Sequence, residues 1–264
     1  MTRLTAPDTA AHYWRGRLEP TGVDAAADGV GPGVEWLMTS RRGGVGRSPF
    51  DDWNLAGHVG DDPQTVSANR AVIADLAGLA PSAVVMMRQC HSAEVAVVQA
   101  ADGQEIVGVD ALVTARPDIV LVALAADCVP VALADPEAGV IGAVHSGWQG
   151  MVSGVTQAAI RAMVDLGAEP GRIRAVLGPA ICGPCYPVPP ERVAAAAAVA
   201  PASAAIAPDG QPGIDVRAGL EVLLADLGVQ VECVGGCTAE SPELFSYRRD
   251  GLTGRQGAAV WRTT

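Results

Sequence analysis

Three short segments of the chain supply candidate ligands for zinc at His91, Cys128 and His145. These segments are Gln89-Cys90-His91-Ser92, Ala126-Asp127-Cys128-Val129-Pro130 and Val144-His145-Ser146-Gly147-Trp148. Two imidazoles and one thiolate leave the fourth position of a tetrahedral zinc ion open for water, as in catalytic zinc sites. The separations between the three ligands match no compact zinc finger, so tertiary folding must bring them together. A catalytic metal site at His91, Cys128 and His145 is therefore the first hypothesis.

The same segments also allow catalysis without a metal. In a cysteine hydrolase, Cys128 would be the nucleophile and His145 its base, and Asp127 would orient the histidine. Such an enzyme could act on amides or cell-wall peptides, and its activity would survive the removal of zinc. Residue types alone do not distinguish thiol–imidazole catalysis from zinc ligation, so both hypotheses stay open at this point.

The remaining cysteines suggest a second metal hypothesis. Cys182-x-x-Cys185 and Cys233-x-x-x-Cys237 supply four thiolates that could close around a structural zinc ion. Only the first pair has the compact spacing of a zinc site, and it lies in a loop rich in proline and glycine at residues 178–186. Six cysteines in 264 residues are too sparse for a disulfide scaffold, so free thiols or metal ligands are expected.

Composition favours an enzyme with extensive β-sheet and disfavours nucleic acid as a partner. Hydrophobic residues make up 49% of the chain and aromatic residues 4%, so the core consists mainly of Ala, Val, Leu and Ile. The formal net charge is −11 and lysine is absent, which is unfavourable for a phosphate-tracking surface. Arginines nevertheless cluster at positions 41–42 and 248–249, with Arg255 nearby. Their planar groups suit a small anion such as phosphate, although a solvated charge pair is the alternative.

Short apolar runs separated by turns predict a central system of sheets. Strands are expected at residues 34–39, 84–87, 95–98, 111–113, 119–126, 129–134, 140–144, 173–177, 229–234 and 258–261. Helices are expected at residues 63–79, 148–166, 191–199 and 216–227. The three proposed metal ligands then fall at or near the ends of strands.

Residues 1–33 lack periodicity and predict a loosely ordered arm, followed by a single catalytic domain at residues 34–264. We find no internal repeat and no interdomain linker. Residues 1–10 lack the apolar core of a secretory signal, and no later stretch of about 20 uncharged apolar residues occurs. These features predict a cytoplasmic protein that does not bind membranes.

The order of the motifs along the chain resembles that of a known family. The three metal-ligand segments are followed by Gly178-Pro179-Ala180-Ile181, Phe245-Ser246-Tyr247-Arg248-Arg249-Asp250-Gly251 and Thr253-Gly254-Arg255-Gln256. In this order they resemble the laccase-domain family. Its members were once called multicopper polyphenol oxidases and are now described as purine nucleoside phosphorylases with adenosine deaminase activity. The resemblance covers residues 34–261.

The resemblance implies an α/β (α+β) fold, a layered sandwich of mixed β-sheets flanked by helices in a single domain. It also implies a zinc ion at His91, Cys128 and His145, where copper could bind instead. The residues that it places near the substrate pocket are Arg41, Asn54, His58 and Arg248. Structural alternatives are the capping of a loop for His58 and an ion pair for Arg248.

The reactions implied are phosphorolysis of adenosine, inosine or guanosine and hydrolytic deamination of adenosine, so the partners are purine nucleosides and phosphate. In deamination, zinc-activated water would attack C6 of the purine, while Asp127 would either move a proton or merely fix its turn. In phosphorolysis, Arg41 is the preferred phosphate anchor, because a guanidinium group binds a phosphate edge through two hydrogen bonds. The sequence does not indicate the oligomeric state.

The chain departs from the family's usual pattern at four positions. Ser92 replaces a glycine, Ser146 an alanine, Gln149 an arginine and Pro187 a glutamate. The change at Gln149 removes a cation, so a phosphate-holding role of that position is in question. Two other functions remain as alternatives. Copper-dependent phenol oxidation would need more than the four histidines present, and a binding module would tolerate loss of Cys128.

Overall fold

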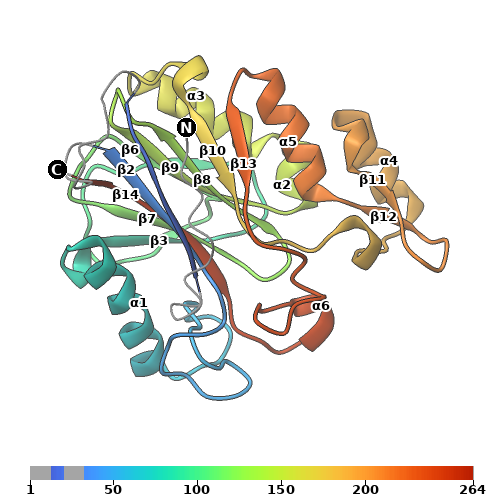
Figure 1. Ribbon diagram of the computed structural model, residues 1–264, viewed down its shortest axis with the longest axis horizontal. Coiled ribbons are helices and arrows are strands. Elements are labelled where there is room, and N and C mark those ends of the chain that lie inside the picture. Colours follow the sequence, from blue (N-terminus) through green and yellow to red (C-terminus); the bar gives the residue numbers. More distant parts are fainter. Residues whose placement is uncertain (1–12, 21–32, 264) are drawn as a thin grey trace.

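Two six-stranded sheets pack against each other in the computed structural model, which describes residues 13–20 and 33–263 (Figure 1). The first sheet has the strand order β1 (Tyr13–Leu18), β2 (Gly33–Thr39), β14 (Gln256–Thr263), β7 (Val120–Ala125), β3 (Val84–Arg88) and β5 (Ile106–Val107). The second has the order β13 (Gln230–Cys233), β10 (Arg174–Leu177), β8 (Val129–Asp135), β9 (Val140–Ser146), β6 (Ala111–Thr114) and β4 (Val95–Val97). A separate ladder pairs β11 (Ala204–Ile206) with β12 (Pro212–Ile214).

Both sheets are mixed, which confirms the predicted fold class. In the first sheet β3 runs parallel to β7 and β5, whereas β14 pairs antiparallel with both β2 and β7. In the second, β10 is parallel to β13 and β4 to β6, and the central pairs are antiparallel. Each strand expected from the sequence is present, with only small shifts at its ends.

Alternation of side chains along the strands creates three apolar layers. In β7, Leu121 and Ala123 face the core between the two sheets, while Val122 faces outward from the first sheet. In β8, Ala132 lies in the same inter-sheet core and Leu133 faces outward from the second sheet. Because side chains on a strand point alternately to opposite faces, an uninterrupted apolar strand serves two layers at once.

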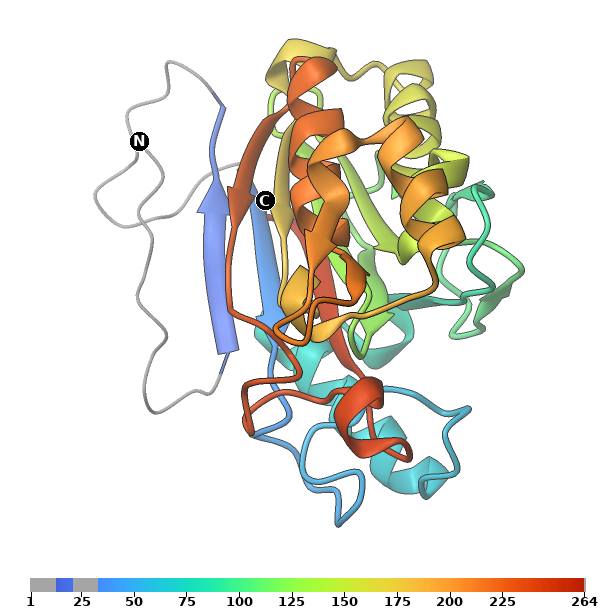
Figure 2. The same ribbon diagram turned by 90° about the vertical axis from the view of Figure 1, so that its right-hand side faces the viewer.

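Helices cover the outer faces of both sheets (Figures 1 and 2). Helix α1 (Pro63–Ala77) packs on the first sheet, and α2 (Trp148–Ser153), α3 (Val155–Asp165) and α5 (Val216–Asp226) pack on the second. Helix α4 (Pro190–Val199) contacts α2, and the short α6 (Tyr247–Asp250) precedes β14. Within the described ranges 13–20 and 33–263, no helix is long and apolar enough to cross a membrane.

The first helix begins where the sequence predicts. The side chain of Asp62 accepts a hydrogen bond from the backbone N–H of Thr65 at 2.9 Å, and Pro63 occupies the first turn. These are the usual features of a helix N-terminus, because the first N–H groups of a helix lack internal partners. The helix ends at Gly78, whose φ of 68° is accessible to glycine at little cost.

The predicted helix at residues 148–166 is two helices. Gly154 adopts a φ of 82° and ends α2, and α3 starts at the next residue. Apolar residues keep helical spacing across the break, which is why periodicity alone predicts one helix. Val155 and Met163 of α3 are buried in the same core as Met151 of α2.

Strand β1 lies within the segment predicted as a loosely ordered arm. It pairs antiparallel with β2, with Tyr13 opposite Thr39. Gly16 interrupts the apolar pattern of the strand because the Trp36 indole occupies its side-chain space, where a Cβ would come within 2.5 Å of the ring. The other parts of the predicted arm, residues 1–12 and 21–32, lie outside the described residues.

Replacing Leu121 with alanine should test the core between the sheets. Leu121 is fully buried, so the change removes packed methyl groups and should lower the free energy of unfolding by about 2–5 kcal/mol. Urea denaturation measures this loss. Val222→Ala, on the exposed face of α5, is the matched control and should shift it by less than about 0.5 kcal/mol. Equal effects of the two changes would contradict the two-sheet core.

Candidate metal centre and substrate cavity

The structure brings the three predicted metal ligands together. The ligand atoms of His91, Cys128 and His145 all lie within 4.8 Å of one another. Nε2 of His91 is 3.8 Å from Sγ of Cys128, and the two imidazole rings meet edge to face with centroids 4.9 Å apart. With Zn–N near 2.0 Å and Zn–S near 2.3 Å, tetrahedral zinc separates its nitrogen and sulfur ligands by about 3.5 Å. The three side chains therefore fit such an ion with little movement.

The registers of the second sheet explain why these ligands meet. The chain crosses from β7 in the first sheet to β8 in the second through the turn that contains Cys128. In the β8–β9 ladder Val129 pairs with Ser146, so the thiol lies next to the end of β9, which carries His145. His91 follows β3, a neighbour of β7 in the first sheet. Both sheets thus contribute to one site.

Asp110 organises two of the three ligands. Its Oδ1 lies 2.8 Å from Nδ1 of His145 and accepts the backbone N–H of His91 at 3.0 Å. Its Oδ2 accepts the backbone N–H of Ser92 at 2.7 Å and the Ser92 hydroxyl at 2.8 Å. With Nδ1 facing this carboxylate, Nε2 of His145 is left to face a metal. In the sequence, Asp110 is marked only as an isolated acid between apolar residues just before a strand, so it was not among the predicted site residues.

Hydrogen bonding keeps Asp110 ionised inside the protein. Burial alone would raise the pKa of this fully buried carboxyl, but the hydrogen bonds from His145 and from the backbone and hydroxyl of Ser92 outweigh it and hold the pKa well below its usual range. The side chain of Ser92 thus adds a hydrogen-bond donor to this carboxylate.

The thiol and imidazole of the site stabilise each other's charged forms. Burial would raise the pKa of the Cys128 thiol, but the adjacent His145 and His91 lower it to about 6. Burial would lower the pKa of His145, but Cys128 and Asp110 raise it to about 9. A thiolate is the form of cysteine that binds metals or attacks electrophiles, so this electrostatic setting suits either role.

Gly147 leaves room directly beside the ligands. A Cβ at this position would lie 2.9 Å from Sγ of Cys128 and 3.2 Å from Cδ2 of His91. No side chain can occupy that space without displacing a ligand. The small residue after His145 and Ser146 is thus a requirement of the site.

Asp127 holds the turn that carries Cys128. The residue has a φ of 94°, which is unusual for a residue other than glycine. Its Oδ1 accepts the hydroxyl groups of Thr238 at 2.6 Å and Ser246 at 2.7 Å, and its Oδ2 accepts the backbone N–H of Arg248 at 2.6 Å. Both carboxylate oxygens are therefore engaged in fixing the turn against the segment that leads into α6.

A cavity of about 410 Å³ opens over the three ligands. Its size falls within the range of about 300–1,000 Å³ that is typical of small-molecule sites. The apolar and aromatic part of its wall includes Leu124, Trp148, Ile181, Tyr186 and Tyr247. Such a surface can bury the face of a heteroaromatic ring while polar groups fix its orientation.

Positive charge gathers on the same cavity. Arg248 and Arg255 line it together with His58, and their guanidinium groups lie over the rings of Tyr186 and Tyr247, at 4.7 and 5.8 Å from the ring centroids. Burial lowers the pKa of Arg255, and burial together with the charge of Arg255 lowers that of His58. Arg255 is partly buried, so an anion would bind it more strongly than it would bind a cation in bulk water.

Two predicted pocket residues lie elsewhere. Arg41 is not part of the cavity wall: its Nε donates to the backbone oxygen of Asp51 at 3.0 Å, and its Nη1 lies 3.8 Å from Asp250. Asn54 is fully buried and does not line the cavity. Its Oδ1 accepts the backbone N–H of Arg255, a residue of the cavity wall, at 2.9 Å. Gln149 also lies outside the wall, although the adjacent Trp148 belongs to it.

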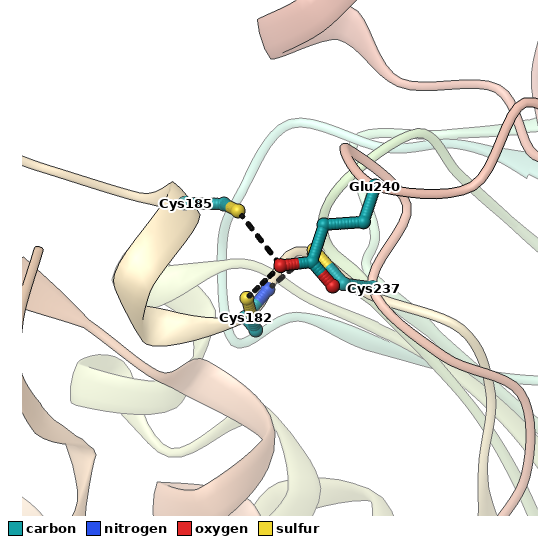
Figure 3. Close-up of side chains that lie close together, drawn as sticks. All are labelled: Cys182, Cys185, Cys237 and Glu240. Atoms are coloured by element: carbon teal, nitrogen blue, oxygen red, sulfur yellow. Dashed lines mark hydrogen bonds between the residues drawn. The ribbon is translucent and has the colours of Figure 1, made fainter. Parts of the chain in front are cut away.

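The second metal hypothesis needs one correction. Cys182, Cys185 and Cys237 do cluster, but the fourth member is Glu240 (Figure 3). Cys233 is exposed at the end of β13, where its thiol lies 3.1 Å from Oε1 of Glu221, and it is not part of the group. Burial is the main cause that raises the pKa of Cys182 and of Cys185, in contrast to the low pKa of redox-active thiols.

Comparison with known proteins defines the class. Residues 35–263 match the family described as multi-copper polyphenol oxidoreductase laccase, and the chain belongs to this family. A purine nucleoside phosphorylase of Streptomyces coelicolor is 50% identical over 231 residues, which is 87% of this chain and 96% of that protein. An adenosine deaminase, RL5, from an unknown prokaryotic organism is 36% identical over 253 residues, covering 87% of this chain and 94% of its own.

Solved structures agree with the fold. YlmD from Geobacillus stearothermophilus superposes with a TM-score of 0.83 at 28% sequence identity and covers all of both chains. A protein from Neisseria meningitidis has a TM-score of 0.79 at 33% identity, covering 88% of this chain and 95% of its own.

Replacing Asp110 with asparagine should weaken the metal centre. Asparagine lacks the charge that balances His145 and one of its side-chain atoms donates rather than accepts, so metal affinity should fall about 10–100-fold. Competition with a chromogenic chelator measures this affinity. Asp118→Asn, which removes an exposed partner of Arg116, is the control and should leave it unchanged. Undiminished affinity in Asp110→Asn would show that His145 needs no orienting carboxylate.

Proposed function

We propose that the protein is a zinc-dependent purine nucleoside enzyme that catalyses phosphorolysis of purine nucleosides and hydrolytic deamination of adenosine. The observation that carries this proposal is the shared cavity, in which the His91, Cys128 and His145 group, an aromatic wall and two arginines converge. Relatives named as purine nucleoside phosphorylases and as an adenosine deaminase support it. Multicopper oxidation is less well supported, since only two imidazoles belong to this group.

The residues of the cavity match the parts of the substrates. Tyr186, Tyr247 and Trp148 offer faces on which a purine can stack, and Arg248 and Arg255 offer charge for phosphate. A zinc ion at the three ligands would supply a Lewis acid to the same cavity. In phosphorolysis a phosphate oxygen forms a bond to C1′ of the ribose as the bond from C1′ to the purine nitrogen breaks. In deamination water replaces the amino group at C6, which leaves as ammonia.

Asp127 has a positioning role in this proposal. Its carboxylate accepts three hydrogen bonds from Thr238, Ser246 and Arg248, so proton transfer would compete with the contacts that hold the turn. The Arg248 backbone is one of these donors, and its side chain lines the cavity. Asp127 thus connects the Cys128 turn to one of the proposed phosphate-binding residues.

A second candidate function is thiol catalysis. The lowered pKa of Cys128 beside His145 is the observation that favours it, because an ion pair of this kind activates a nucleophilic cysteine. Such a cysteine hydrolase would act on amides or peptides and would not need a metal. Metal dependence separates the two functions.

The test is chromatography of adenosine incubated with the purified protein, with and without phosphate. Adenine that forms only with phosphate indicates phosphorolysis, and inosine indicates deamination. Removal of metal by a chelator should abolish both products, and added zinc should restore them. Cys128→Ala should lose the bound zinc of this centre and both products, since a thiolate ligand is gone. No turnover by the zinc-loaded protein would contradict the proposal, and metal-independent peptide or amide cleavage would favour thiol catalysis.

Arg255→Gln should separate the two reactions. It removes a partly desolvated cation, whose hydrogen bonds to an anion are worth about 1.5–3 kcal/mol, so KM for phosphate should rise about 10–100-fold. Deamination, which uses no phosphate, is the internal control and should change far less. Arg161→Gln, on the exposed face of α3, controls for charge. An unchanged KM for phosphate in Arg255→Gln would contradict this role. If KM for phosphate rose in Arg41→Ala instead, Arg41 would be the phosphate anchor.

A further inference from the structure

We infer that the chain binds a second zinc ion, held by Cys182, Cys185, Cys237 and Glu240. The four ligand atoms lie within 4.8 Å of one another, and their side chains point toward a common centre (Figure 3). Oε1 of Glu240 is 3.5 Å from Sγ of Cys185 and 4.0 Å from Sγ of Cys182. In a tetrahedral site two thiolates lie about 3.8 Å apart, and a thiolate and a carboxylate oxygen about 3.5 Å. The group is already close to the size that the ion requires.

The loop around the first two cysteines is shaped to present them together. Gly183–Cys185 forms a 3₁₀ turn, and with three residues per turn it places positions 182 and 185 on the same side. Gly183 is packed so closely that a Cβ would lie 2.4 Å from the Cβ of Ala205. Its backbone N–H donates to Asp215 at 3.0 Å. The pair is thus held by contacts outside the cluster.

The second half of the group is docked on the first by backbone pairing. Ala180 and Cys237 form a parallel bridge, and the Thr238 N–H donates to the Ala180 carbonyl at 3.1 Å. The Cys182 N–H donates to Sγ of Cys237 at 3.3 Å. Gly235 has a φ of 70° and packs on Pro179, where a Cβ would come within 2.6 Å. Two segments far apart in sequence therefore meet in a defined register at the ligands.

The donor set favours zinc over other soft metals. Thiolates select zinc, monovalent copper or iron–sulfur clusters. Of these, zinc also accepts the carboxylate oxygen of Asp or Glu as a ligand. Four protein ligands would close the coordination sphere, which is the arrangement of a structural site. The neighbouring cation does not compete, since all the donors of the Arg249 guanidinium are used by Asp250 and by the carbonyls of Thr238, Ser241 and Leu244.

This ion would stabilise the neighbouring cavity. Ile181, next to Cys182, donates its N–H to the Asp127 carbonyl at 2.9 Å, and Thr238, next to Cys237, donates its hydroxyl to the Asp127 carboxylate. The second site therefore joins the two segments that hold the Cys128 turn. The inference stands on the cluster itself; only the expected total of two ions rests on the proposed function, because it also counts the zinc at His91, Cys128 and His145.

Counting zinc per chain tests the inference. Protein purified under reducing conditions with zinc and freed of loosely bound metal should contain two zinc ions per chain by atomic emission. Cys182→Ala combined with Cys185→Ala should halve this content and lower the melting temperature. Cys233→Ala, outside the cluster, should still bind two. A wild-type protein with a single zinc that the double variant retains would overturn the inference, as would a Cys182–Cys185 disulfide in the freshly reduced and purified protein.

Cobalt spectroscopy covers the case in which the double variant does not fold. Three thiolates would bind cobalt at the second site and one at the first, so Cys128→Ala should keep about three quarters of the thiolate-to-cobalt absorption. Loss of the entire absorption in that variant would overturn the inference. Glu240→Gln changes an exposed side chain, and the cobalt that it binds should show altered ligand-field bands. Both readouts are unaffected by whether the protein acts on nucleosides.

Discussion

A buried carboxylate, that of Asp110, joins the loop after β3 to the last residues of β9. It accepts backbone N–H groups from the first segment and faces Nδ1 of His145 in the second. Burying one charge without partners would cost several kcal/mol, so the surrounding donors are a condition of its presence. In return the carboxylate holds the backbone of His91 in the loop after β3. It also determines which ring nitrogen of His145 faces the other ligands. The geometry of the candidate metal centre depends on this one group.

The remaining parts of the site depend on how the chain passes between the two sheets. The turn from β7 to β8 places Cys128 beside the residues that Asp110 positions, and Asp127 secures that turn to Thr238 and Ser246. The segment before α6 then contributes Arg248 to the cavity. Metal ligands, aromatic wall and cations therefore come from segments that become neighbours only through the packing of both sheets.

Local physical signals account for what the sequence could predict. The β-branched runs predicted the strands, Asp62-Pro63 predicted the start of α1, and the residue types of His91, Cys128 and His145 predicted a group that the structure assembles. Interactions between distant residues account for the rest. Gly16 made β1 hard to predict, because it lacks a side chain where the Trp36 indole lies. Nothing local in the sequence indicates that Asp110 contacts His145. The same holds for the contacts of Arg41 with Asp51 and Asp250. Likewise, Glu240 joins the cysteines through a register that spacing does not reveal.

The place of β14 in the first sheet has a consequence for biosynthesis. Residues 256–263 form a strand that lies between β2 and β7 and pairs with both. Without it, β2 and β7 have no direct pairing with each other. His91, Cys128 and His145 are translated well before it. Until β14 leaves the ribosome, the nascent chain has two unpaired strand edges where the sheet should be continuous, and such edges recruit other strands. The first sheet is therefore closed by the last of its strands to be translated, and the strands made earlier must remain protected until then.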